Sequence, residues 1–120
     1  MKQLLLGLAL VFTTPLFANC EDPMSQLDMN ACAHQAYNQA VKTLNSYVEK
    51  LQKDETFDYT NKEFLKDALR EWEEYREAEC NFESDVIARG GSLQPLIFWT
   101  CMEELTLKQY DRVRSSIERY

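Results

Sequence analysis

The residues best suited to chemistry are acidic, and they crowd one stretch of the chain. Residues 71–92, EWEEYREAECNFESDVIARGGS, interleave carboxylates with aromatic side chains. Two carboxylates with separated pKa values would suit hydrolysis of a glycosidic bond. The pattern instead predicts a solvated helix face or a protein-binding face, and no catalytic residue, because most of the glutamates fall off the helical line of the aromatic residues. Those glutamates are Glu71, Glu73, Glu74, Glu77 and Glu83.

Other catalytic and metal chemistry has little support in the sequence. His34 is the sole histidine, and no base–nucleophile pattern accompanies it, as a hydrolytic triad would require. Zinc sites use closely spaced cysteine pairs, whereas the four cysteines are separated by 11, 47 and 20 residues. We therefore predict no enzyme activity, no metal and no cofactor. In an exported protein such cysteines form disulfides; they are Cys20, Cys32, Cys80 and Cys101.

The cysteine positions predict a hairpin. Cys80 lies ten residues before Gly90, and Cys101 lies ten residues after Gly91. Antiparallel helices that fold back at these glycines would bring the two cysteines to the same height, so we predict a Cys80–Cys101 disulfide. A Cys20–Cys32 disulfide would then hold the N-terminal tail on the first helix. Of the three possible pairings, this one needs the fewest further assumptions.

The first helix is predicted over residues 28–53, with Ser25 or Asp28 as its N-cap. The polar residues 53–59 that follow lack periodicity and form the connection. Apolar residues recur in the helix at spacings of three and four, as expected for one buried face. They are Ala33, Tyr37, Ala40, Leu44, Tyr47 and Leu51.

The second helix is predicted to start at Thr60, which forms an S/T-x-x-E capping box with Glu63, beside a Tyr59/Phe64 hydrophobic staple. Gly90 ends this helix, and Ser92 caps a third helix from about residue 93 to near 119. The predicted apolar line of the second helix is Leu65, Ala68, Trp72, Tyr75, Phe82 and Val86. The predicted aromatic core is Tyr37, Tyr47, Phe64, Trp72, Tyr75 and Phe82.

These elements predict an all-α fold, a small antiparallel three-helix bundle stapled by two disulfides. Residues 1–18 read as a secretory signal peptide, with Lys2 before the apolar run 4–12 and cleavage after Ala18. Residues 19–120 form one helical domain with no transmembrane segment. We expect a periplasmic or secreted protein. Lipidation of Cys20 is disfavoured because Asn19 precedes it and three cysteines would remain.

The net charge of −7 becomes one unit more negative when the signal peptide is removed with Lys2. Nucleic acids and anionic membranes call for basic patches, so neither is an expected partner. A cationic protein is the expected partner.

Several motifs together resemble the LprI-like lysozyme-inhibitor domain family. They are MNACAHQAYNQAVKTLNSYV at 29–48, LREWEEYREAECNFE at 69–83, GGS at 90–92, and the segment from Cys101 to ELT at 104–106. The most specific is W-x-x-Y-R-x-x-x-C, followed by two glycines. Its residues are Trp72, Tyr75, Arg76, Cys80, Gly90 and Gly91.

The resemblance implies a small exported helical protein that inhibits lysozyme, with a c-type lysozyme or another cell-wall hydrolase as its partner. We predict that Arg89 and Ser92, on a turn held rigid by the disulfide, contact the partner with little loss of conformational entropy. Glu73 and Glu77 are the predicted acidic contacts. Two alternatives are a structural or adaptor module of the cell envelope and an immunity protein against a delivered cell-wall hydrolase.

Overall fold

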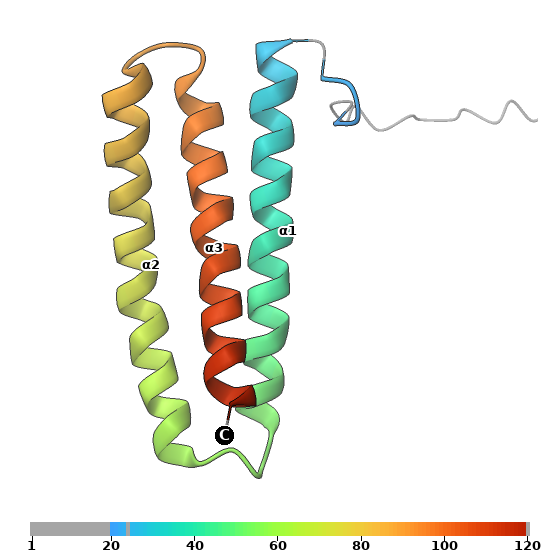
Figure 1. Ribbon diagram of the computed structural model, residues 1–120, viewed down its shortest axis with the longest axis vertical. Coiled ribbons are helices and arrows are strands. Elements are labelled where there is room, and N and C mark those ends of the chain that lie inside the picture. The colour runs from blue at the N-terminus through green and yellow to red at the C-terminus, as the bar shows by residue number, and fades with distance from the viewer. Residues whose placement is uncertain (1–19, 24, 120) are drawn as a thin grey trace, which may run out of the picture.

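The computed structural model describes residues 20–23 and 25–119 and contains three helices, α1 (Gln26–Lys53), α2 (Tyr59–Ala88) and α3 (Gln94–Glu118). Consecutive helices run in opposite directions, and α3 lies between the other two (Figure 1). No strand is present in the described part of the chain. The predicted all-α, three-helix fold is therefore confirmed, while the predicted signal peptide lies outside the described residues.

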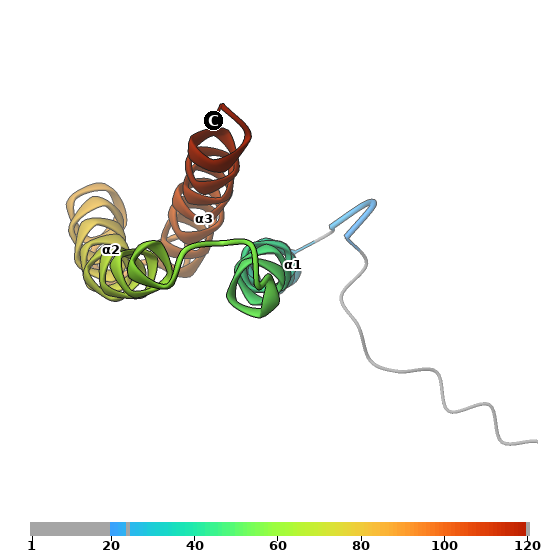
Figure 2. The same ribbon diagram turned by 90° about the horizontal axis from the view of Figure 1, so that it is seen from below.

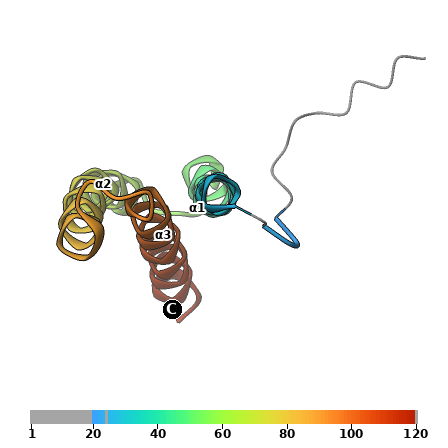
Figure 3. The ribbon, with the colours of Figure 1, turned by 90° about the horizontal axis from the view of Figure 1, so that it is seen from above.

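Helix α3 is the centre of the molecule. It packs against both α1 and α2, which have almost no contact with each other. Seen from above, α1 and α2 stand on opposite sides of α3 (Figure 3). Seen from below, the C-terminal end of α3 stands away from the line that joins the other two helices (Figure 2). It follows that α2 has one close helical neighbour and keeps most of its circumference in solvent.

Helix α1 matches its prediction closely. The Ser25 side chain accepts a hydrogen bond of 3.0 Å from the Asp28 N–H and caps the helix. Lys50 and Lys53 in the last turn complement the partial negative charge of the helix C-terminus. Four residues of the predicted apolar line are buried, namely Ala33, Ala40, Leu44 and Leu51.

The predicted N-caps of the other two helices were wrong. Asp58, not Thr60, caps α2 by accepting a hydrogen bond of 3.1 Å from the Asn61 N–H. A carboxylate is the stronger partner for the partial positive charge at a helix N-terminus. No described side chain caps α3, which has Leu93 at the cap position and a proline in its first turn. The carbonyl of Ser92 instead accepts a 3.0 Å hydrogen bond from the Asn30 side chain of α1.

The turn between α2 and α3 uses its glycines as predicted. Gly90 has a φ of 70°, the left-handed conformation that favours glycine after a helix. Its N–H donates a 2.8 Å hydrogen bond to the side-chain oxygen of Gln94. The Gly91 N–H donates a 2.9 Å bond to the Ala88 carbonyl. These bonds tie the turn to both helices that it joins.

Both predicted disulfides are present, Cys20–Cys32 with a Cα–Cα distance of 5.4 Å and Cys80–Cys101 with 5.5 Å. The second joins α2 to α3 and is almost fully buried. With Met102 it forms the centre of the hydrophobic core. The half-buried side chains packed around this centre are Tyr37, Phe98, Trp99 and Leu105.

The predicted buried face of α2 was partly wrong. Tyr75, Phe82 and Val86 were expected in the core, but they are 56%, 66% and 68% exposed. Phe64, another predicted core aromatic, is 66% exposed. The side of α2 against α3 follows a neighbouring line that includes a cation and a cysteine, which a purely apolar pattern misses. Its residues are Leu65, Leu69, Trp72, Arg76, Cys80 and Ser84.

The orientation of α2 about its own axis predicts that truncation of two aromatic residues one turn apart has different effects on stability. Trp72→Ala is expected to lower the free energy of unfolding by about 3 kcal/mol, as truncation of a packed aromatic does. Tyr75→Ala should change it by less than about 0.5 kcal/mol, because most of that side chain is in water. Urea unfolding followed by circular dichroism measures both. Equal losses would contradict this orientation of α2.

Candidate protein-binding site

Arg76 connects all three helices. From α2, its Nη1 donates a 3.2 Å hydrogen bond to the hydroxyl of Thr106 on α3. Its guanidinium lies 4.7 Å from the ring centroid of Trp72 and 5.4 Å from that of Tyr37 on α1. Thr106 is fully buried, and its hydroxyl donates a 2.6 Å hydrogen bond to the Met102 carbonyl. Thr106 was not among the predicted site residues, since a single threonine on a helix gives no pattern.

The positively charged guanidinium of Arg76 lies against the faces of aromatic rings. No carboxylate of the described residues lies within 4 Å of the Arg76 nitrogens. The buried Nε has no hydrogen-bond partner among residues 20–23 and 25–119. Arg76 instead makes two cation–π contacts, each worth about 0.5–2 kcal/mol. Arg76 is therefore a packing residue that holds the three helices together.

The turn that joins α2 to α3 places Arg89 and Ser92 together at one end of the molecule. Arg89 is exposed and forms a two-pronged ion pair with Asp85, with nitrogen–oxygen distances of 2.6–3.1 Å. The hydrogen bond from Arg89 lowers the pKa of Asp85, and the same contact raises the pKa of Arg89. The pair therefore persists until the pH falls through the lowered pKa of Asp85. Arg89 is held in place, with its remaining N–H groups facing solvent.

Negative charge is concentrated on α2. This helix carries nine acidic and four basic residues, whereas α1 and α3 are each within one unit of neutrality. Glu73 and Glu77 are exposed, as the prediction of a solvated acidic face requires. A cationic molecule that approaches the protein would therefore be drawn towards α2.

The lone histidine lies in an aromatic cluster. The ring centroid of His34 is 4.2 Å from that of Trp99, which in turn lies 4.8 Å from that of Phe98. His34 thus packs at the exposed edge of the contact between α1 and α3. Among the described residues, no three histidine, cysteine or acidic side chains gather as metal ligands would.

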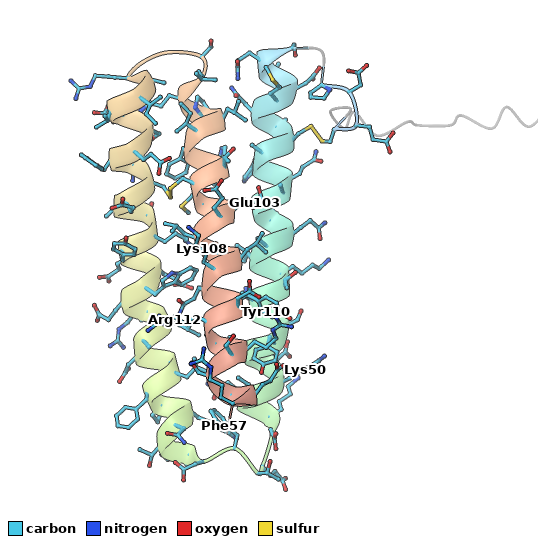
Figure 4. The ribbon with its side chains drawn as sticks, in the orientation of Figure 1. Lys50, Phe57, Glu103, Lys108, Tyr110 and Arg112 are labelled. Carbon is cyan, nitrogen blue, oxygen red and sulfur yellow. A yellow bond between two sulfur atoms is a disulfide. The ribbon has the colours of Figure 1, made fainter. Side chains whose placement is uncertain are left out.

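A hollow of about 530 Å³ opens between the N-terminal half of α2 and the C-terminal half of α3. Leu65 and Ala68 of α2 face Val113 and Ile117 of α3 across it. Phe57 and Arg112, which also line it, are labelled near the lower end of the molecule in Figure 4. The hollow forms where the C-terminal end of α3 diverges from α2, and it is large enough to receive a side chain of a partner.

None of the three helices has an apolar stretch long enough to cross a bilayer, as far as the described residues show. The chain matches the family model described as "Lysozyme inhibitor LprI" over residues 18–112. It is also similar to the "Uncharacterized protein R02472" of Rhizobium meliloti (strain 1021), with 33% identity over 131 residues that cover 94% of this chain and 92% of that protein. No solved structure matches significantly.

The contacts of Arg76 predict that its planar guanidinium matters beyond its charge. Arg76→Lys is expected to lower the free energy of unfolding by about 1–3 kcal/mol, because an ammonium cannot stack on two rings and bond Thr106 together. Arg70→Lys is the matched control on the same helix. That side chain is 62% exposed, so its change should stay within about 0.5 kcal/mol. Equal midpoints in urea for the two variants would contradict the bridging role of Arg76.

Proposed function

Because the chain belongs to the LprI lysozyme-inhibitor family, we propose that it is an exported protein that binds a lysozyme or a related cell-wall hydrolase and blocks its activity. The observation that carries the proposal is the family match, which spans α1, α2 and most of α3. Removal of residues 1–18 as a signal peptide is part of the proposal. The two disulfides are consistent with an oxidising compartment outside the cytoplasm.

The charge distribution supports a cationic partner. Many lysozymes are strongly basic, and the excess acidic residues of α2 would steer such an enzyme towards this helix. Glu73 and Glu77 contribute to this field from exposed positions. Electrostatic steering raises the association rate, and short-range contacts then set the dissociation rate.

The turn between α2 and α3 is a second part of the proposed binding surface. The Cys80–Cys101 disulfide and the hydrogen bonds of Gly90 and Gly91 limit its freedom. A rigid turn loses little conformational entropy when it inserts into a cleft. Arg89 and Ser92 are the residues proposed to meet the enzyme there.

The proposal predicts direct inhibition. Disulfide-intact protein purified after export should slow the clearing of a bacterial cell-wall suspension by a c-type lysozyme. Steering is screened by salt, with a Debye length of about 10 Å at 0.1 M ionic strength and about 3 Å at 1 M. The association rate, measured by surface plasmon resonance, should therefore fall at least about tenfold over that range.

A chain whose disulfides have been reduced and alkylated serves as the control. Absence of inhibition by the oxidised chain, against several lysozyme types, would reject the proposed function. An association rate that does not depend on salt would leave inhibition standing but remove steering by α2 from its explanation.

A further inference from the structure

The outer face of α2 carries an exposed apolar stripe. It consists of Phe64, Ala68, Tyr75, Phe82 and Val86, spaced by 4, 7, 7 and 4 residues. At about 100° per residue these positions fall within an arc of about 40°, and the stripe is about 33 Å long. Its four large side chains are 56–68% exposed. Scattered apolar residues on a surface are ordinary, but large apolar residues that recur along one exposed helix face mark an interaction surface.

No helix of the described residues covers the stripe. It lies to one side of the line through Trp72 and Cys80 that packs on α3, and α1 barely contacts α2. Of the three helices in the described part of the chain, α2 forms one outer edge (Figure 1). The stripe is also rich in aromatic side chains, which are enriched at the centres of protein–protein interfaces. The lower part of the stripe meets the hollow between α2 and α3 at Ala68.

The charges beside the stripe identify the kind of partner. Viewed down the helix axis, Asp67, Glu71 and Glu79 lie within about 100° of the centre of the stripe. Every lysine and arginine of α2 lies farther round the helix, at least about 80° beyond the edge of the stripe. At the upper end, Arg89 is occupied by Asp85. A second copy of the chain packed stripe to stripe would set carboxylates against carboxylates, which is unfavourable. A partner surface with apolar groups bordered by lysine or arginine fits both the apolar stripe and its acidic border.

We propose that the exposed stripe of α2, with its acidic border, is the surface on which the chain docks the cationic lysozyme of the proposed function. This inference rests on that function and extends it by naming the interface. The apolar side chains supply the short-range contact, and the acidic border pairs with basic residues of the enzyme. The hollow at Ala68 receives an apolar side chain of the enzyme.

The test compares variants of the exported, disulfide-intact chain in binding to a c-type lysozyme by surface plasmon resonance. Tyr75→Ser with Phe82→Ser should weaken binding at least about tenfold, chiefly through faster dissociation, as loss of central aromatic contacts does. Leu27→Ser with Leu107→Ser is the matched control. These side chains are 78% and 40% exposed on the other two helices, and their loss should leave the dissociation constant unchanged within about twofold.

A second pair of variants separates contact from long-range attraction. Glu71→Gln with Glu79→Gln and Glu73→Gln with Glu77→Gln remove the same charge from the same helix, so both should slow association similarly at low salt. Only the first pair borders the stripe, so only it should speed dissociation, by severalfold. Thermal unfolding verifies that each variant is folded. If the serine variant does not fold, the comparison of the glutamine pairs decides the question.

The outcomes are distinct. If the unaltered chain inhibits lysozyme and the serine variant binds equally well, the inference is overturned and the proposed function stands. If the unaltered chain neither binds nor inhibits lysozyme, both the inference and the proposed function are rejected. A dimer of the chain alone in light scattering that the serine variant converts to a monomer would assign the stripe to a second copy and overturn the inference.

Discussion

The disulfide between Cys80 and Cys101 holds α2 against α3, and the remaining features of α2 depend on it. Because α2 barely touches α1, it lacks the two-sided packing that usually stabilises a helix in a bundle. Closing a loop of this length with a disulfide contributes about 3 kcal/mol in the chain-entropy model. One turn away, Arg76 adds a second link through Thr106 and the ring of Tyr37. The disulfide and the stacked guanidinium of Arg76 thus hold α2 in place, a role that a broad apolar face has in other bundles.

This mode of attachment leaves the outer face of α2 available. A helix that needs only a narrow buried line can present aromatic and acidic side chains to solvent along its length. The same helix carries most of the net charge of the protein, so long-range attraction and short-range contact would act at one surface. The rigid turn at Gly90 and Gly91 continues that surface at the end of α2. The lysozyme-inhibitor family match and the physical character of α2 therefore support the same kind of partner.

The sequence predicted the helices, both disulfides and the left-handed glycine, because each rests on a local or symmetric pattern. It did not predict the rotation of α2. Periodicity placed Tyr75 and Phe82 inside, since apolar side chains are normally counted as core. In the structure Arg76 takes an inward position, because aromatic rings and the Thr106 hydroxyl solvate its guanidinium. The separation of α1 from α2 depends on tertiary packing, and the local sequence pattern does not encode it.

The most direct test of this account is a nuclear magnetic resonance titration of the isotope-labelled, disulfide-intact chain with an unlabelled c-type lysozyme. Amide and aromatic signals along residues 64–86 of α2 should shift or broaden, with smaller changes at 89–92 and few on the far side of α1. Changes confined to α1, or no changes at a saturating concentration of the enzyme, would contradict the claim that α2 carries the interface.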